Sequence, residues 1–375
     1  MLLDILGAAR LPITLESGRG SRVWDTEGNA YWDFYGGHAV TLLGQAHPAW
    51  VNAIAEQAAK LSFMTTLTDV PVRTSAGEAV CAFTGMDVAW FVNSGAEANE
   101  AALKIARKAT GRPVIVAMQK GFHGRSMGAL GVTWGYRDQH APAYGEVRFV
   151  PFGDLEALAA ALDDTVAAVI TEPIQGIAGI VVPPEGWLAE VARLAHANGS
   201  LLIADEVQSG MGRTGYPLAC HQVGVHPDIA TVGKGLGAGF PVAALLLTDA
   251  MARTVRPGEH GTTFGGAPLA CAAVEATLRI MAEEGLLATA RLLGEHMLAT
   301  LKVPGVTAVR GSGAWVALVL DRPAGPVAHQ LREHGFLVGT ASDPHVLRLA
   351  PPAATPLAAV DELATALTAL LAPSA

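Results

Sequence analysis

Short, continuous apolar runs alternate with longer segments of helical periodicity between about residues 88 and 250. The runs lack the polar–apolar alternation of a half-exposed strand, so they predict strands that are covered on both faces. Helical segments between such strands predict an α/β fold with a mostly parallel central sheet. The predicted strands are 88–92, 114–118, 147–150, 167–172, 201–205, 229–232 and 242–247, and the predicted helices are 96–109, 154–162 and 185–198.

The pattern changes in the last third of the chain. Two long helical segments come first, and short strands and further helices follow them, which predicts a smaller α+β domain. Near the other end, residues 22–32 predict a hairpin that turns at 27–29 and is expected to join the smaller domain or to lie across the active site. We therefore predict an N-terminal segment at 1–50 that belongs to the small domain, a large domain at 51–265 and a C-terminal small domain at 266–375. The helices expected in the last part are 268–284, 286–301, 326–334 and 358–371, and the strands are 306–310, 315–320 and 346–349.

Composition narrows the class of protein. Of 375 residues 51% are hydrophobic and only 16% are charged, but much of the apolar content is alanine and no apolar run reaches the ~20 residues of a membrane-spanning helix. The net charge of −9 argues against nucleic acid as a partner. Residues 1–7 lack the basic region of a signal peptide, and three scattered cysteines, Cys81, Cys220 and Cys271, fit no metal spacing and suit reduced, buried thiols. We expect a cytoplasmic protein with no metal site and no membrane partner.

Lys234 is the most informative single residue. It follows the apolar run 229–232 and stands among the glycines of 233–239. Desolvation disfavours the ammonium form, so the pKa of this lysine is expected to be low and its amine nucleophilic, as a Schiff-base lysine requires. The glycines allow a flat cofactor to approach the backbone closely.

Asp205 ends the apolar run 201–205, 29 positions before Lys234. Ligands of parallel sheets bind beyond the carboxyl ends of the strands, so these two residues are expected to meet in space. A lysine that holds the aldehyde and an aspartate that holds the ring nitrogen are the minimum set for pyridoxal phosphate. The alternative for Asp205 is a structural role, capping the turn after its strand.

Residues 91–100 predict a strand, a turn of small residues and the start of a helix. Ser94, Gly95 and Ala96 place backbone N–H groups at the positive end of that helix, where a phosphate binds well. A capped helix without a ligand is the simpler interpretation of this motif alone. The presence of Asp205 and Lys234 favours the phosphate.

Phe122 and Arg125 follow the strand 114–118. An aromatic ring at a strand exit can cover one face of a pyridine, although an ordinary core position would also explain Phe122. Arg125 suits bidentate capture of a substrate carboxylate, and its alternative is a surface ion pair. Gln208 could donate to the phenolic oxygen of the cofactor, while Glu172 either bonds to nearby groups or is a buried structural glutamate.

Together these motifs resemble the class III, fold-type I pyridoxal-phosphate aminotransferases of the acetylornithine and ornithine aminotransferase group. The resemblance runs from about residue 20 to residue 352. It is carried by residues 93–104, 122–125, 172–176 and 205–215, by Lys234, and by residues 260–266.

The resemblance implies roles that the residues alone do not give. Lys234 would form the Schiff base with pyridoxal 5'-phosphate and shuttle the proton, Asp205 would pair with the ring nitrogen, and Phe122 would stack on the ring. Thr262 and Thr263, which by themselves indicate only a polar loop, would contact the phosphate of the neighbouring subunit, so the active unit would be a homodimer with shared active sites. The full set of cofactor-binding residues implied is Ser94, Gly95, Ala96, Phe122, His123, Glu172, Asp205, Val207, Gln208, Lys234, Thr262 and Thr263.

Two arginines match substrate-binding residues of the family. Arg125 would hold the α-carboxylate of a substrate whose distal amine reacts, and Arg348 would hold a carboxylate of 2-oxoglutarate or glutamate. The resemblance therefore implies an aminotransferase that moves the terminal amine of N-acetylornithine, or of a close ornithine or lysine relative, to 2-oxoglutarate in arginine or lysine biosynthesis. Residues 131–134 and Arg73 are similar to lysine-pathway members, whose substrate can be tethered to a carrier protein.

The chain departs from the family pattern at two positions near the substrate. Ile177 stands where relatives carry a glutamate that pairs with the arginine matching Arg348. We expect either an anion or substrate on Arg348 or another carboxylate beside it, because an unpaired buried guanidinium is costly. His38 stands where relatives have tyrosine or an aliphatic residue, and it either faces the substrate or is a satisfied core histidine.

The alternative functions are those of related enzymes. One is another ω-amine aminotransferase, acting for example on 4-aminobutyrate or lysine, and the other is a pyridoxal-phosphate aminomutase or epimerase of the same fold.

Overall fold

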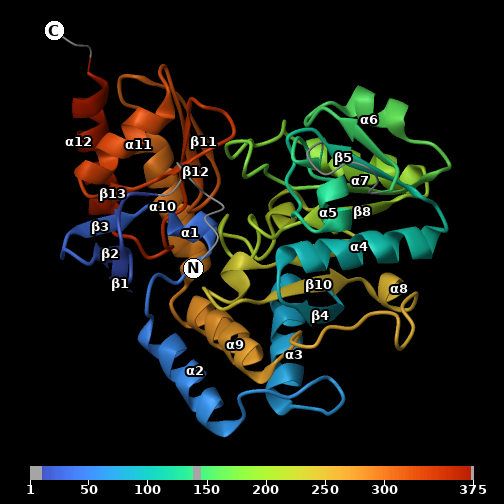
Figure 1. Ribbon diagram of the computed structural model, residues 1–375. Helices are drawn as coiled ribbons and strands as arrows, with labels where there is room; N and C mark the ends of the chain where they lie inside the picture. The colour runs from blue at the N-terminus through green and yellow to red at the C-terminus, as the bar shows by residue number, and fades with distance from the viewer. Residues whose placement is uncertain (1–10, 138–144, 373–375) are drawn as a thin grey trace.

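A seven-stranded sheet forms the core of the larger part of the molecule, which lies on the right in Figure 1. The computed structural model describes residues 11–137 and 145–372. Five neighbouring strands run parallel, and β10 is antiparallel to the strands on both its sides, which confirms the mostly parallel sheet. In the order β4-β10-β9-β8-β7-β5-β6, the strands are β4 (Val88–Val92), β10 (Ala243–Leu247), β9 (Ile229–Val232), β8 (Leu201–Asp205), β7 (Val166–Thr171), β5 (Val114–Met118) and β6 (Val147–Val150).

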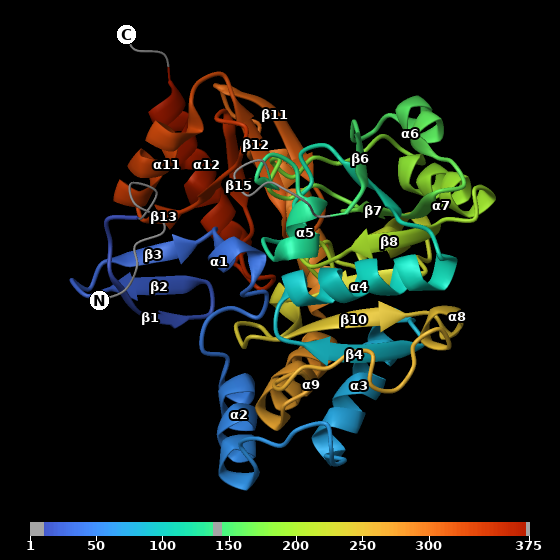
Figure 2. The same ribbon diagram turned by 45° about the vertical axis from the view of Figure 1, so that its right-hand side comes forward.

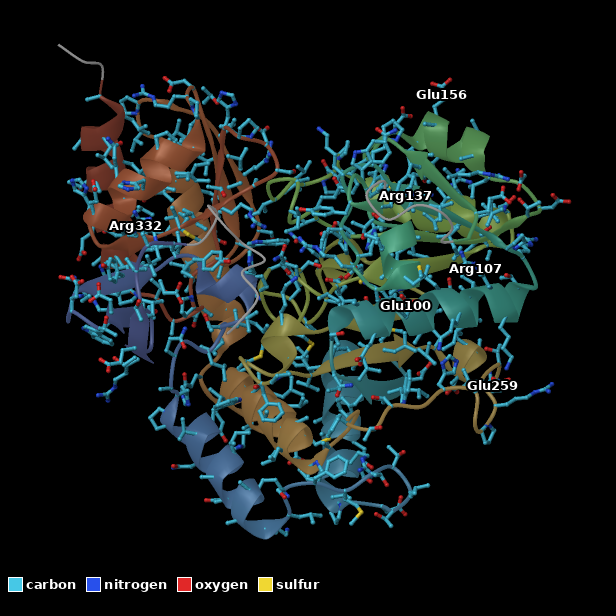
Figure 3. The ribbon with its side chains drawn as sticks, in the orientation of Figure 1. Glu100, Arg107, Arg137, Glu156, Glu259 and Arg332 are labelled. Atoms are coloured by element: carbon cyan, nitrogen blue, oxygen red, sulfur yellow. The ribbon has the colours of Figure 1, made fainter. Side chains whose placement is uncertain are left out.

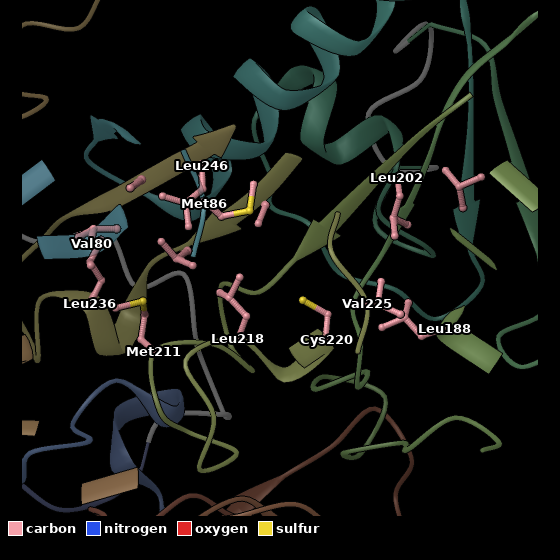
Figure 4. Close-up of a cluster of buried hydrophobic side chains, with 14 of the residues drawn as sticks. Val80, Met86, Leu188, Leu202, Met211, Leu218, Cys220, Val225, Leu236 and Leu246 are labelled. Atoms are coloured by element: carbon pink, nitrogen blue, oxygen red, sulfur yellow. The ribbon is translucent and has the colours of Figure 1, made fainter. Parts of the chain in front are cut away.

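Helices cover both faces of this sheet, as the continuous apolar runs predict. Alternate residues of β5 enter opposite cores: Val116 packs in the larger cluster, and Ile115 packs against α4 (Gly95–Thr110). Figure 4 shows part of the larger cluster, in which Leu202 and Leu246 from the sheet meet Val80 and Leu188 from helices. That face is covered by α3 (Pro71–Thr84), α6 (Leu155–Ala161), α7 (Trp187–Ala197) and part of α9 (Pro268–Glu283).

A second layer of strands and helices lies beside the large sheet. Its four-stranded sheet has the order β11-β12-β15-β14, and α10, α11 and α12 pack on it through a separate hydrophobic core (Figure 2). The elements are β11 (Val306–Gly311), β12 (Val316–Leu320), β14 (Gly339–Thr340), β15 (Val346–Leu349), α10 (Leu286–Thr300), α11 (Ala324–Glu333) and α12 (Leu357–Leu371).

The N-terminal hairpin joins this smaller part, which was the first of the two placements expected for it. β2 (Arg22–Asp25) pairs with β3 (Ala30–Asp33), and β3 pairs in parallel with β13 (Phe336–Leu337). β1 (Leu15–Arg19) completes the sheet on the other side of β2.

The helix α9 contributes to both hydrophobic cores. Cys271 and Val274 belong to the core of the large sheet, whereas Ile280 and Met281 belong to the core of the smaller part. The domain boundaries at residues 50 and 265 stay predictions, because the helix that follows the second boundary is shared.

Two properties expected from composition can be compared with the described residues. Within 11–137 and 145–372, no helix is both long and apolar enough to cross a membrane. Cys220 and Cys271 are buried free thiols as predicted, whereas Cys81 is only half-buried. Residues 1–7, which argued against a signal peptide, lie outside the described residues.

Candidate active site

A cavity of about 390 Å³ opens at the carboxyl ends of the central strands. It contains the predicted lysine and aspartate, which the neighbouring strands β8 and β9 carry to the same edge of the sheet. Most of the predicted cofactor residues line it, together with several residues outside the predicted cofactor set. The predicted residues on its wall are Ser94, Gly95, Ala96, Phe122, His123, Glu172, Asp205, Val207, Gln208 and Lys234, and the wall also includes Asn93, Asn99 and Ile177.

Lys234 stands two residues after the end of β9, at a backbone φ of 43°. Such a left-handed conformation is uncommon for a residue with a Cβ and is frequent at functional sites, where the surrounding structure enforces it. Desolvation lowers the pKa of the Lys234 amine, and the charge of Arg348 acts in the same direction against the attraction of Asp205 and Glu172. The lysine is therefore closer to its nucleophilic form than a lysine in water.

The Asp205 carboxylate is held by three donors within 3.0 Å, and the Thr231 hydroxyl lies 3.5 Å from Oδ1. Oδ2 accepts hydrogen bonds from His123 Nδ1 at 2.7 Å and Asn99 Nδ2 at 2.8 Å, and Oδ1 accepts one from the backbone N–H of Val207 at 3.0 Å. Burial alone would raise the pKa of Asp205, but the hydrogen bonds and the charge of His123 bring it below its usual value. Asp205 is thus a buried carboxylate that stays ionised, as a partner of a protonated ring nitrogen must.

His123 lies behind Asp205, with its ring completely enclosed. Burial opposes a charged imidazole, whereas the hydrogen bond and charge of Asp205 raise the pKa of His123. Its Nε2 atom has no hydrogen-bond partner among the described residues, so an Nδ1–H that donates to Asp205 satisfies the ring best. The sequence placed His123 among cofactor-binding residues, and the structure adds that its polar contact is to Asp205.

Asn99 is a site residue that the sequence reasoning missed. Its amide donates to Asp205 and to the carbonyl of His123, and its Oδ1 accepts from the Thr231 hydroxyl. Asparagine is a poor helix former, yet Asn99 lies on the buried face of α4. That local conflict was the available indication of a functional position.

The turn before α4 both caps the helix and lines the cavity, so the two interpretations of its sequence, a helix cap and a phosphate site, are compatible. Ser94 caps the helix by accepting a hydrogen bond from Glu97 N at 3.3 Å, and the same turn lines the cavity. The N–H groups of Gly95 and Ala96 belong to the first turn, which has no intrahelical acceptors for them. A Cβ at position 95 would lie 2.6 Å from Val207 Cγ1, so glycine is required where the turn approaches the wall.

Glu172 holds the strand exits of β5 and β7 together. Its carboxylate accepts from the backbone N–H groups of Phe122 and Gly176, both at 3.0 Å. Burial raises the pKa of Glu172. The Phe122 ring lines the cavity and makes an edge contact with Tyr136, with the ring centroids 5.6 Å apart. Its stacking on a cofactor ring stays a prediction.

Arg125 is exposed beside Phe122 and is not part of the cavity wall. Its guanidinium lies 4.8 Å from the Tyr136 ring centroid and 5.7 Å from that of Phe122, a cation–π arrangement. The segment that follows it is fixed by Glu100, which accepts from the N–H groups of Gly128 and Ala129 at the start of α5 (Met127–Gly131) (Figure 3). No salt bridge between described residues involves Arg125, so the surface ion pair is not observed there.

Arg348 and His38 lie together, apart from the main cavity. They line a small space of about 10 Å³ with Tyr35, Gln208 and Trp315. His38 has a φ of 62°, and burial, together with the charges of Arg348 and Lys234, lowers its pKa to about 4. His38 is therefore a neutral imidazole at pH 7. Gln208, expected to reach the cofactor, donates to the His38 carbonyl at 3.0 Å and also lines the main cavity.

Of the two alternatives expected for Arg348, another carboxylate in place of the partner lost at Ile177 is not found among the described residues. Arg348 donates from Nε to the Thr340 carbonyl at 2.7 Å and from Nη1 to the Gly176 carbonyl at 3.2 Å, and no described carboxylate is within salt-bridge distance. Backbone carbonyls satisfy donors without neutralising charge. Burial accordingly lowers the pKa of Arg348, and an anion on this guanidinium stays the prediction.

Thr262 and Thr263 do not line the cavity of their own chain. The Thr262 hydroxyl accepts a hydrogen bond from Asn93 Nδ2 at 3.1 Å, whereas Thr263 is exposed. Their contact with a neighbouring subunit's phosphate stays a prediction.

A planar pyridine that carries a phosphate arm fits these residues. The cavity offers an ionised acceptor at Asp205, a poorly solvated amine at Lys234, and a glycine-dependent cradle of N–H groups at the start of α4. With the mostly parallel sheet, these features define a pyridoxal-phosphate enzyme of fold type I.

Comparison with known proteins narrows this class. The family model of the class-III aminotransferases, "Aminotransferase class-III", matches residues 6–371. The acetylornithine aminotransferase of Streptomyces coelicolor is 44% identical over 358 residues, which cover 93% of this chain and 88% of that protein. The chain belongs to the class-III aminotransferases, and its cofactor is pyridoxal 5'-phosphate.

Solved structures agree with this membership. The acetylornithine aminotransferase of Elizabethkingia anophelis superimposes with a TM-score of 0.86 at 33% identity, covering 96% of this chain and 94% of that one. The ornithine aminotransferase of Toxoplasma gondii gives a TM-score of 0.91 at 33% identity, covering 97% and 91%.

Proposed function

We propose that this aminotransferase moves the terminal amine of N-acetylornithine, or of a close ornithine- or lysine-type amine, to 2-oxoglutarate. The products are a semialdehyde and glutamate, within arginine or lysine biosynthesis. The observation that carries the proposal is the presence of Lys234 and Asp205 on the wall of one cavity. The choice of substrate is supported by relatives of 40–45% identity that are named acetylornithine aminotransferase.

The chain's own residues divide the work. Bound pyridoxal phosphate supplies an electron sink for the reacting substrate carbon. Lys234 Nζ, with its lowered pKa, takes the proton from that carbon of the amine donor and passes it on rather than returning it, because the carbon ends as the carbonyl of the semialdehyde. Asp205 stays ionised and holds a proton on the ring nitrogen, while His123 and Asn99 fix the orientation of its carboxylate.

Substrate carboxylates are assigned to two guanidinium groups. Arg125 holds the α-carboxylate of the amine donor at the exposed side of Phe122, and Arg348 holds a carboxylate of the acceptor. Neutral His38 lies beside Arg348 and adds no competing charge at pH 7. Ile177 makes the adjoining wall apolar.

The proposal includes a cytoplasmic homodimer. The exposure of Thr263, next to a Thr262 that bonds to the wall residue Asn93, supports a loop that also reaches a neighbouring subunit. No nucleic acid, membrane or metal takes part in this scheme.

A donor screen tests the function. Ornithine, N-acetylornithine, lysine, N-acetyllysine and 4-aminobutyrate are each incubated with 2-oxoglutarate, and glutamate is measured. We expect N-acetylornithine to give the highest kcat/KM and Lys234→Ala to abolish glutamate formation. Glutamate from none of the donors, with isomerised amine recovered instead, would support an aminomutase or epimerase and overturn the proposal.

A further inference from the structure

We propose that Arg73 is a positioning residue for the cofactor phosphate, although it lies outside the cavity wall. Arg73 fixes the loop 262–266, and this loop holds Asn93, which directly precedes the phosphate-binding turn 94–96. The inference rests on the proposed phosphate site at residues 94–96.

The Arg73 guanidinium joins two separate segments of chain. Nε donates to the Gly266 carbonyl at 2.7 Å, and Nη1 donates to the Thr68 carbonyl at 2.8 Å. Nη2 donates to the carbonyls of Met64 at 2.9 Å and Thr65 at 3.2 Å. Every nitrogen of the group is thereby used, and all four acceptors are backbone carbonyls of loops rather than of helices or strands.

Two further contacts show that the loops fit around this side chain. Gly266 has a φ of +69°, and a Cβ there would lie 3.1 Å from Arg73 Nε, so the glycine lets the loop close against the arginine. The rings of Phe63 and Phe264 pack together, with centroids 5.4 Å apart. In Figure 1 the loop between α2 (Pro48–Lys60) and α3 and the segment that leads into α9 both run beside the end of α3.

The loop 262–266 touches the cofactor site through Thr262. Its hydroxyl accepts from Gly265 N at 3.3 Å inside the loop and from Asn93 Nδ2 at 3.1 Å across to the cavity wall. Asn93 also donates through its backbone N–H and its Nδ2 to Glu97 Oε2, at 2.7 and 2.9 Å. The hydrogen bonds of Arg73 and of Thr262, joined through the backbone of the loop, therefore connect Arg73 to Asn93, the residue directly before Ser94.

Arginine suits this position because its planar fork presents five N–H donors in fixed directions. Lysine has one compact ammonium, which cannot reach the Gly266 and Met64 carbonyls in the same way. Loss of the fork frees the loop, and Asn93 then no longer holds the phosphate-binding N–H groups in place. The expected effect is on cofactor affinity, while the chemistry at Lys234 is unchanged once cofactor is bound.

The first experiment measures the Kd of pyridoxal phosphate for the full-length apoenzyme, by absorbance titration, together with the visible spectrum at saturation. We expect Arg73→Ala to raise Kd about tenfold or more and Arg73→Lys to restore only part of the affinity, both with an unchanged saturated spectrum. The matched control is Arg112→Ala, since Arg112 also bonds loop and strand carbonyls, those of Val166 and Asn198, but lies far from the cavity. It should leave Kd unchanged.

A general packing role makes a different prediction. If Arg73 only stabilises the fold, Arg73→Ala lowers the apoenzyme melting temperature and leaves the Kd of pyridoxal phosphate as in the parent. That result would overturn the inference.

A double-mutant cycle tests the route of the effect. Asn93→Ala removes the donor to Thr262 and keeps Thr262 itself, which is expected to contact the neighbouring subunit's phosphate, so Arg73→Ala should add little to the Kd of an Asn93→Ala protein. If the two substitutions raised Kd by the product of their separate effects, Arg73 would act by another route, and the proposal would be contradicted. Failure of the underlying phosphate site is recognised separately, because Gly95→Ala would then also leave Kd unchanged.

Discussion

At the scale of the residue, Lys234 combines an unusual backbone conformation with a poorly solvated amine. Only the neutral amine attacks an aldehyde, and desolvation moves the pKa of this amine below the ordinary value of 10.5. The rate at which apoenzyme takes up pyridoxal phosphate should therefore rise with pH and level off below pH 10.5. Stopped-flow absorbance across a pH series measures this rate. The fraction of folded protein is measured at each pH, and the rates are compared at equal concentrations of folded protein.

A different pH dependence of the uptake rate would contradict the lowered pKa of Lys234. A rate that levels off only at about pH 10.5 or above would mean that the pKa of the amine is not lowered and would contradict its desolvation. A free lysine analogue treated with the cofactor under the same conditions gives the reference curve.

At the scale of the element, the turn that opens α4 depends on the absence of a side chain at position 95. A Cβ there would lie 2.6 and 2.8 Å from the two methyl groups of Val207, so the turn must move away from the wall. Gly95→Ala should raise the Kd of pyridoxal phosphate at least about tenfold, the equivalent of ~1.4 kcal/mol. Adding Val207→Ala, which removes those methyl groups, should recover most of the affinity in the same titration.

A glycine in an open position provides the control for that element. Gly325 lies inside α11 with no atom near an added Cβ, so Gly325→Ala should leave cofactor affinity unchanged and stabilise its helix slightly. Equal losses of affinity in both alanine variants would mean that the effect at position 95 is not local.

The elements also show how far sequence patterns reach. The five strands β4, β5, β6, β8 and β9 begin and end at the predicted residues. Burial on both faces explains the continuous apolar runs of β5, β8 and β9, whereas the edge strands β4 and β6 are only partly buried. The helix α2 was not predicted; none of its residues is fully buried, and Ala49 and Trp50 pack only partly against the core of the smaller part, although Pro48 in its first turn was an available indication. For α3 the indications were present, Pro71 at its start and Gly85 in the left-handed conformation after its end.

The site divides in the same way. Residues set by strand ends and by a helix start were found, because their place follows from local order along the chain. Asn99 was missed because its partners, Asp205 and Thr231, come from strands more than a hundred residues later. The carbonyl partners of Arg348 were missed because a backbone acceptor leaves no trace in side-chain identity.

At the scale of the whole molecule, the shared active site of a homodimer can be tested by mixing subunits. Lys234→Ala and Thr263→Ala chains are prepared separately, unfolded together and refolded. If Thr263 serves the neighbouring subunit, one site of each mixed dimer has an intact Lys234 and an intact partner Thr263. Aminotransferase activity of the mixture should then exceed that of either parent, approaching a quarter of wild type for random pairing.

Activity of the mixture equal to the mean of the two separate preparations would place Thr263 in its own chain's site or outside any site. The proportion of mixed dimers is measured independently with a mass tag on one variant, so that poor exchange is not mistaken for lack of complementation.

The helix α9 gives the architecture one further property. Its first turns carry Cys271 and Val274 into the large core, and its last turns carry Ile280 and Met281 into the smaller one. A chain that ended at residue 267 would lack the whole C-terminal part and also the residues of α9 that pack against α3. The larger part is therefore not expected to fold stably without α9. Because α9 packs into both cores, a movement of one lobe against the other would have to carry this helix with it.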